Sequence, residues 1–137
     1  MNRRFAFRYG KEEVEFEVPE GQILDVLKGR NRDAPADLLG TYRSALDHPL
    51  DSPPLSELVR PGERVLITIS DITRGWQRND LLMPTLLDYL NEAGVRDSDI
   101  TVVIAVGAHR FNTDEEFVEL CSEEVCHRVH VVNHDCY

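Results

Sequence analysis

The sequence predicts an α/β fold, in which a parallel β-sheet has helices on both faces and an N-terminal β-hairpin precedes it. Residues 64–70 and 99–107 are too aliphatic for strands with one exposed face, and residues 128–134 form a third apolar segment. Segments with helical periodicity separate the three strands, which is typical of a parallel sheet with right-handed connections. Residues 55–137 are therefore predicted to form a Rossmann-like βαβαβ core.

The N-terminal part of the chain predicts a hairpin and one helix. Within residues 1–20, apolar side chains alternate with polar ones on both sides of a Gly-Lys turn: Phe5, Phe7, Val14, Phe16 and Val18. Residues 19–30 predict a turn and then a short apolar-faced element. Residues 36–47 predict a helix that ends before a proline-rich segment.

Further helical segments connect the predicted core strands. Residues 55–63 predict a helical turn and a Pro-Gly break, and residues 80–93 predict a helix that ends at Gly94. The apolar stripe of this second helix is expected to be Leu82, Leu86, Leu90 and Ala93. Thr113 and Glu116 have the spacing of a capping box, so residues 113–124 are expected to form one helix.

A doubly wound sheet usually has a helix after its third strand, and none follows here before Tyr137. We therefore expect an incomplete domain. The apolar face beside the last strand, which that helix would cover, is expected to be exposed and to promote self-association.

Composition restricts the class of protein. With 42% hydrophobic and 29% charged residues, the 137-residue chain is expected to form one globular domain. Its net charge of −10 and scattered basic residues do not indicate a nucleic-acid binder. The longest aliphatic stretch, residues 100–106, is too short to cross a membrane, and no signal peptide is visible. Three cysteines without a secretory signal favour reduced thiols, so a cytoplasmic location is expected.

Polar side chains follow each of the three strands: Asp71, Thr73 and Arg74; His109, Arg110 and Asn112; and Asn133, His134 and Asp135. Ligands of open α/β sheets bind beyond the carboxyl ends of the strands. The sequence therefore predicts a functional cleft at this edge of the sheet.

Two interpretations of these residues remain open. His109 has the chemistry of a proton-transfer residue, and Gly107 would let a ligand approach it; alternatively, His109 is a solvated loop histidine bonded to a carboxylate. Arg74 could bind a carboxylate or phosphate, and Asp71 could orient either this arginine or a histidine. Alternatively, Arg74 is a surface arginine beside a turn that Asp71 caps. Arg110 is a weaker candidate for the same cleft.

A metal site is not predicted. Cys121 and Cys126 are five residues apart and do not form the closely spaced pairs of a structural zinc site. Phosphate-binding glycine motifs, a serine-hydrolase elbow and a His-Glu-x-x-His motif are absent from the sequence.

The segments "SDITRG", "LLMPTLLDYLNEAGV", "DITVVIAVGAHRFNTDEEFVEL" and "HVVNHD" occur in this order. Together they resemble the N-terminal part of the nickel-dependent lactate racemase family, over roughly residues 12–137. The similarity is sharpest from residue 65 onward.

This resemblance implies a two-domain α/β enzyme that uses a nickel pincer nucleotide tethered to a lysine. Hydride would leave the α-carbon of a 2-hydroxy acid and return to either face, while two histidines act as bases toward the hydroxyl group. His109 falls on one of these histidines, and Asp71, Thr73 and Arg74 fall on an active-site segment that would hold the substrate carboxylate or position His109.

The second histidine, the lysine and the nickel-binding histidine fall in family segments beyond Tyr137, so no cofactor is expected on this chain by itself. "GWQRND" also stands where the family has prolines, in a loop that would shape substrate choice.

The sequence thus favours the N-terminal portion of a 2-hydroxy-acid racemase or epimerase that cannot turn over alone. One alternative is a stand-alone module that binds a small anion without catalysis. Another is an unrelated α/β domain whose strand-end residues are simply solvated.

Overall fold

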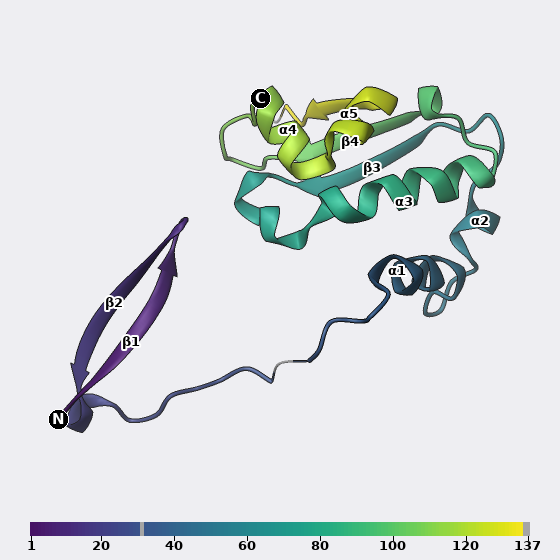
Figure 1. Cartoon of the computed structure of the whole chain (residues 1–137). Coiled ribbons are helices and arrows are strands. Elements are labelled where there is room, and N and C mark those ends of the chain that lie inside the picture. The colour runs from purple at the N-terminus through teal and green to yellow at the C-terminus, as the bar shows by residue number, and fades with distance from the viewer. Residues whose placement is uncertain (31, 136–137) are drawn as a thin grey trace. The chain divides into compact units, whose positions relative to one another are not determined.

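The computed structural model describes residues 1–30 and 32–135 and divides the chain into two compact units, Met1–Asp33 and Ala34–Tyr137. The first unit holds a β-hairpin, and the second holds a small sheet with its helices (Figure 1).

The hairpin has two faces of opposite character, as its alternating sequence predicts. β1 (Asn2–Tyr9) pairs antiparallel with β2 (Glu12–Pro19), and the Phe16 ring stacks against Phe5 and Phe7 at centroid distances of 5.9 and 5.3 Å. A short 3-10 turn, η1 (Glu20–Gln22), follows. The apolar-faced element predicted next does not form as a helix or strand, since residues 23–30 have neither.

The fold class of the second unit is confirmed. β3 (Val65–Ser70), β4 (Ile100–Ala105) and β5 (His130–Asn133) form a parallel sheet in the order β3-β4-β5. The helices are α1 (Leu38–Asp47), α2 (Leu55–Leu58), α3 (Asn79–Glu92), α4 (Asp114–Cys121) and α5 (Glu123–Arg128). Two 3-10 segments, η2 (Ile72–Gln77) and η3 (Asp97–Asp99), precede α3 and β4.

The parallel sheet with its helices agrees with the α/β prediction, and the helices between its strands share one face in the residues that the structure describes (Figure 1). The helices α3, α4 and α5 contact one another and cover one face (Figure 1). Right-handed connections between strands that follow one another in spatial order keep their helices on the same side. The other face leaves Leu66 63% exposed, together with Thr68.

The buried stripe of α3 differs from the predicted one. Met83, Leu87 and Leu90 are buried on α3, whereas Leu82 and Leu86 are only half-buried. Leu90 was predicted correctly, but Met83 and Leu87 replace Leu82 and Leu86, and Tyr89 is buried as well, because α3 contacts α1, α4 and α5.

Gly94 ends α3, as predicted. Its φ of +94° is left-handed, and the N–H groups of Gly94 and Val95 donate to the carbonyls of Asn91 and Leu90 at 2.9 and 3.0 Å. These two bonds form the Schellman arrangement, which satisfies carbonyls that the helix itself leaves unpaired.

The predicted helix over residues 113–124 is broken into α4 and α5. Thr113 and Glu116 do form the capping box at the start of α4. Ser122, with φ of +82°, then ends α4, and its hydroxyl accepts from the Val125 N–H to start α5.

The core of the second unit lies between the sheet and its helices. Cys121 belongs to it as a small buried residue, as expected, and burial raises the pKa of its thiol to about 12. Cys121 and Cys126 are free thiols, and Cys136 lies outside the described residues. Among the described residues, no helix has both the length and the hydropathy that a membrane span requires. The other core residues are Ile69, Met83, Leu87, Leu90, Val95, Ile100, Val102, Ile104, Val106, Leu120, Val125 and Val129.

Candidate functional site

A pocket of about 170 Å³ lies at the carboxyl ends of β3 and β4. Four of the predicted site residues line it: Asp71, Thr73, Arg74 and His109. The parallel sheet brings them together because β3 and β4 are neighbours in register, with Ser70 opposite Ala105. The predicted convergence of these four residues at one edge of the sheet is therefore observed.

Asp71 is the buried anion of this pocket. It precedes η2 and is 4% exposed. Its Oδ1 accepts hydrogen bonds from the hydroxyl and the N–H of Thr73 at 2.6 and 3.2 Å, and its Oδ2 contacts Nδ1 of His109. The two carboxylate oxygens are thus used by different partners, which fixes the plane of the side chain.

The protonation of the Asp71–His109 pair follows from these contacts. Burial acts to raise the pKa of Asp71, but the hydrogen bonds from Thr73 and His109 act in the opposite direction and hold the pKa below its usual value of 3.8. An ionised carboxylate only accepts hydrogen bonds, so Nδ1 of His109 is the donor. A neutral ring then carries its lone pair on Nε2.

His109 lies in the loop that follows β4. The chain turns at Gly107, whose φ is +58°, and the His109 N–H donates to the Val106 carbonyl at 3.0 Å. The side chain is 57% exposed, in contrast to the 5% of its partner Asp71. One ring nitrogen is therefore held by a buried group while the ring remains accessible to a ligand.

The two arginines predicted for the cleft have different surroundings. Arg110 donates to both carboxylate oxygens of Glu116, at 2.8 and 2.6 Å, and the same interaction lowers the pKa of Glu116 to about 2. Arg74 lines the pocket, and no carboxylate among the described residues pairs with its guanidinium. The substrate role of Arg110 stays a prediction, but Arg74 has the more available positive charge.

Two asparagines connect the ends of all three strands. The Ile72 N–H donates to Oδ1 of Asn112 at 3.0 Å, and Asn112 donates through its N–H and Nδ2 to Oδ1 of Asn133 at 3.0 and 2.9 Å. Nδ2 of Asn133 in turn donates to the Asn112 carbonyl at 2.9 Å. Sequence reasoning named both residues at strand ends and gave them no role, because asparagine is common in any loop.

The end of β5 contributes less to the pocket. The His134 N–H donates to the Ile104 carbonyl at 2.9 Å, and its side chain is exposed. Within residues 1–30 and 32–135, no three His, Cys, Asp or Glu side chains gather as metal ligands would.

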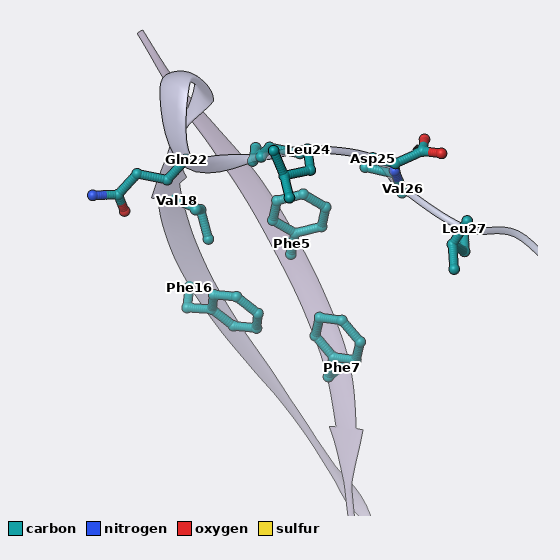
Figure 2. Close-up of a pocket in the computed structure, with 10 residues that line it drawn as sticks. Phe5, Phe7, Phe16, Val18, Gln22, Leu24, Asp25, Val26 and Leu27 are labelled. Carbon is teal, nitrogen blue, oxygen red and sulfur yellow. Dashed lines mark hydrogen bonds between the residues drawn. The ribbon is translucent and has the colours of Figure 1, made fainter.

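A second hollow, of about 470 Å³, lies in the N-terminal unit. Figure 2 shows the rings of Phe5, Phe7 and Phe16 on the hairpin, and Leu24 on the segment after η1. Asp25 is the one ionisable residue among its described lining residues, so this hollow is apolar and lacks the acid–base groups of the strand-end pocket.

Known proteins similar to this chain are lactate racemases. One, from Thermoanaerobacterium thermosaccharolyticum, is 25% identical over 93% of the chain and 30% of that protein. Another, from Lactiplantibacillus plantarum, is 33% identical over 69% of the chain and 22% of that protein. The chain therefore spans less than a third of the length of these relatives.

A solved structure shares the fold of this chain, and a family model identifies its family. The structure of the lactate racemase apoprotein from Thermoanaerobacterium thermosaccharolyticum matches 97% of this chain and 30% of its own chain, with a TM-score of 0.74 and 24% identity, which shows a shared fold. The model of the lactate racemase N-terminal domain matches residues 9–137. The chain belongs to the lactate racemase N-terminal domain family.

Proposed function

We propose that this chain is the N-terminal part of the catalytic domain of a 2-hydroxy-acid racemase or epimerase, in which His109 is one of two proton-transfer bases. The observation that carries the proposal is the Asp71–His109 hydrogen bond at a pocket that Arg74 also lines. Family membership supports the reaction class, since both relatives are lactate racemases.

His109 would take the proton of the substrate hydroxyl group. A base for this step needs a lone pair within hydrogen-bond reach and a charge state that changes near neutral pH, which imidazole has. The bond from Nδ1 to Asp71 directs the lone pair to Nε2, and the buried carboxylate would stabilise the imidazolium that forms. Returning the proton would complete the exchange.

Arg74 and Thr73 would bind the substrate. A 2-hydroxy acid carries a carboxylate next to its reacting carbon, and a planar guanidinium can hold that carboxylate through two parallel hydrogen bonds. Arg74 has no ion-pair partner in the described part of the chain, so its guanidinium is available to pair with the substrate carboxylate.

The nickel pincer nucleotide implied by the family resemblance does not fit the described residues alone. Both lysines of the sequence, Lys11 and Lys28, precede the α/β unit, and no cluster of three potential metal ligands occurs among the described residues. We therefore assign to this chain only proton transfer and anion binding. The cofactor, which would supply the hydride acceptor, would be held by other segments of the complete protein.

The test is racemisation by the complete protein, expressed with cofactor-maturation enzymes and assayed on a panel of 2-hydroxy acids. His109→Ala is expected to lower the rate by about 10²- to 10⁴-fold, the usual contribution of a general base. His134→Ala is the matched control, because this exposed histidine lies outside the pocket. Unchanged racemisation by His109→Ala would refute the catalytic assignment.

The alternative function is anion binding without catalysis. The available guanidinium of Arg74 favours it equally. It predicts that the complete protein binds a 2-hydroxy acid, loses this binding in Arg74→Gln, and shows no racemisation with any member of the panel.

A further inference from the structure

We propose that Asn112 is a positioning residue that sets the distance between Asp71 and His109, and that Asn133 holds Asn112 in place. This inference rests on the proposed function, because the separation of the pair matters only if His109 transfers protons.

Asn112 fixes the Asp71 side of the pair. Its Oδ1 accepts from the N–H of Ile72, the residue directly after Asp71, at 3.0 Å. This bond crosses from the loop after β4 to the end of β3. The backbone that carries Asp71 therefore cannot move away from the neighbouring loop without breaking it.

The same residue fixes the His109 side. The loop from residue 106 to residue 112 is closed near its start by the bond from the His109 N–H to the Val106 carbonyl. At its end, Asn112 donates its own N–H to Asn133 at 3.0 Å. His109 thus lies on a short loop that these two bonds hold at both ends, and the side chain of Asn112, at the second end, also binds the residue after Asp71.

Asn133 determines how the Asn112 side chain points. Oδ1 of Asn133 accepts from Nδ2 of Asn112 at 2.9 Å, while the opposite end of that amide, Oδ1, accepts from Ile72. A reversed amide would place two donors against each other at Ile72 and two acceptors against each other at Asn133. Asn112 is also only 6% exposed, so water is poorly placed to replace these bonds.

These bonds would hold the proton-accepting ring of His109 in a fixed position relative to Asp71. Small misplacements of a catalytic group lower the rate of proton transfer strongly, because the reacting atoms must already be close and aligned. Removing the Asn112 amide would leave the Ile72 N–H and the Asn133 Oδ1 without this partner. The loop that carries His109 would then move relative to Asp71.

The test measures His109 itself as well as activity. In ¹⁵N-labelled protein, the ring nitrogens of wild-type His109 are expected to report the Nδ1–H tautomer. Asn112→Ala and Asn133→Ala are expected to shift these resonances toward a mixture of tautomers. In the complete protein, both variants are expected to lower kcat by about tenfold while KM changes less than about twofold.

Asn91→Ala is the matched control. Asn91 also makes several side-chain hydrogen bonds, to the Val95 carbonyl and to Asp97, but at the C-terminal end of α3, outside the strand-end pocket. It is expected to lower stability and leave the His109 resonances and kcat unchanged. If Asn112→Ala does not fold, Asn112→Asp replaces it, since this variant keeps the shape and the acceptor for Ile72 but opposes Asn133 Oδ1 with a carboxylate oxygen.

Unchanged His109 resonances in a folded Asn112 variant would overturn the proposal. So would unfolding of both Asn112 variants when Asn91→Ala still folds, because Asn112 would then have only a general structural role. The nuclear magnetic resonance result does not depend on turnover. A complete protein that fails to racemise would refute the proposed function. The ring-nitrogen resonances of His109 test the role of Asn112 whether or not the protein racemises its substrate.

Discussion

At the scale of single residues, the pocket depends on a few contacts with distinct physical roles. Asp71 is buried and accepts hydrogen bonds from Thr73 and His109, while the His109 ring stays accessible. Arg74 supplies positive charge without a partner among the described residues, whereas Arg110 is paired with Glu116. A single substitution at each residue can test its role.

Asp71→Asn is expected to lower racemisation by about 10²- to 10⁴-fold with little change in the fold of the protein. The amide keeps the shape of the carboxylate, but it can donate to Nδ1 of His109 and so favour the tautomer with a proton on Nε2. Ring-nitrogen resonances of His109 check the tautomer. An Asp71→Asn variant with wild-type tautomer and rate would contradict the alignment of His109 by Asp71.

Arg74→Gln is expected to raise KM for a 2-hydroxy acid by about 10- to 100-fold, since a hydrogen bond to a charged group contributes about 1.5–3 kcal/mol. Arg74→Lys keeps the charge and is expected to recover part of this loss. Arg110→Gln is the comparison. It breaks the contact with Glu116, so it is expected to lower the Tm and to leave KM nearly unchanged. Equal effects of Arg74→Gln and Arg110→Gln on KM would show that both guanidiniums bind substrate.

At the scale of elements, helix ends explain much of the local structure. Gly94 terminates α3 through its left-handed backbone, and Thr113 with Glu116 begins α4. Residues within a few positions of each other determine both features, which is why the sequence predicted them. The break at Ser122 was not predicted, since serine has no general requirement for a positive φ.

Gly94→Ala and Gly107→Ala form a matched pair for stability. Both glycines have positive φ, so each substitution is expected to cost about 1 kcal/mol of backbone strain. A Cβ at Gly94 would also lie 2.6 Å from Cγ of Pro61, whereas one at Gly107 would meet no atom within 4 Å. Chemical denaturation should therefore show a larger loss for Gly94→Ala; equal losses would mean that Pro61 moves aside freely.

Glu116→Gln is expected to reduce the acid sensitivity of the fold. The hydrogen bond from Arg110 lowers the pKa of Glu116 from 4.5 to about 2, so the carboxylate stabilises the folded state above pH 4.5. This stabilisation is lost as the pH falls toward 2. The variant keeps a capping oxygen for the Thr113 N–H, and its Tm should change less over this pH range.

Glu116→Ala provides the control for the cap. It removes both the charge and the capping oxygen, so its Tm is expected to lie below that of Glu116→Gln at every pH. Identical pH profiles for wild type and Glu116→Gln would show that the pair with Arg110 contributes nothing to folding.

For the molecule as a whole, α3, α4 and α5 lie on one face of the sheet (Figure 1), and exposed side chains occur on the other face. Leu66 on β3, an edge strand, is the most exposed apolar residue there. We expect this face to associate with a second copy of the chain, because an exposed apolar surface on a sheet favours association.

Leu66→Lys is expected to lower the average mass measured by light scattering at high protein concentration. Leu50→Lys is the matched control, since Leu50 is 95% exposed and lies outside the sheet. A wild-type protein that stays monomeric at high concentration would contradict the predicted association.

Features that depend on nearby residues or on strand order could be predicted from the amino-acid sequence. These include the two-faced hairpin, the caps at Thr113 and Gly94, and the meeting of Asp71, Arg74 and His109 at one edge of a parallel sheet. Alternation and capping act over short distances along the chain, and the direction of parallel strands follows from the order of strands and helices, so both are visible in the sequence.

Long-range packing determines which face of the sheet the helices cover, which residues of α3 are buried, and which carboxylate pairs with Arg110. It also decided that Asn112 and Asn133 connect all three strand ends. Each of these outcomes depends on segments that are distant in sequence and meet only when the sheet and its helices pack. Their pairing is therefore determined by geometry and burial, for which a polar loop residue gives no local signal.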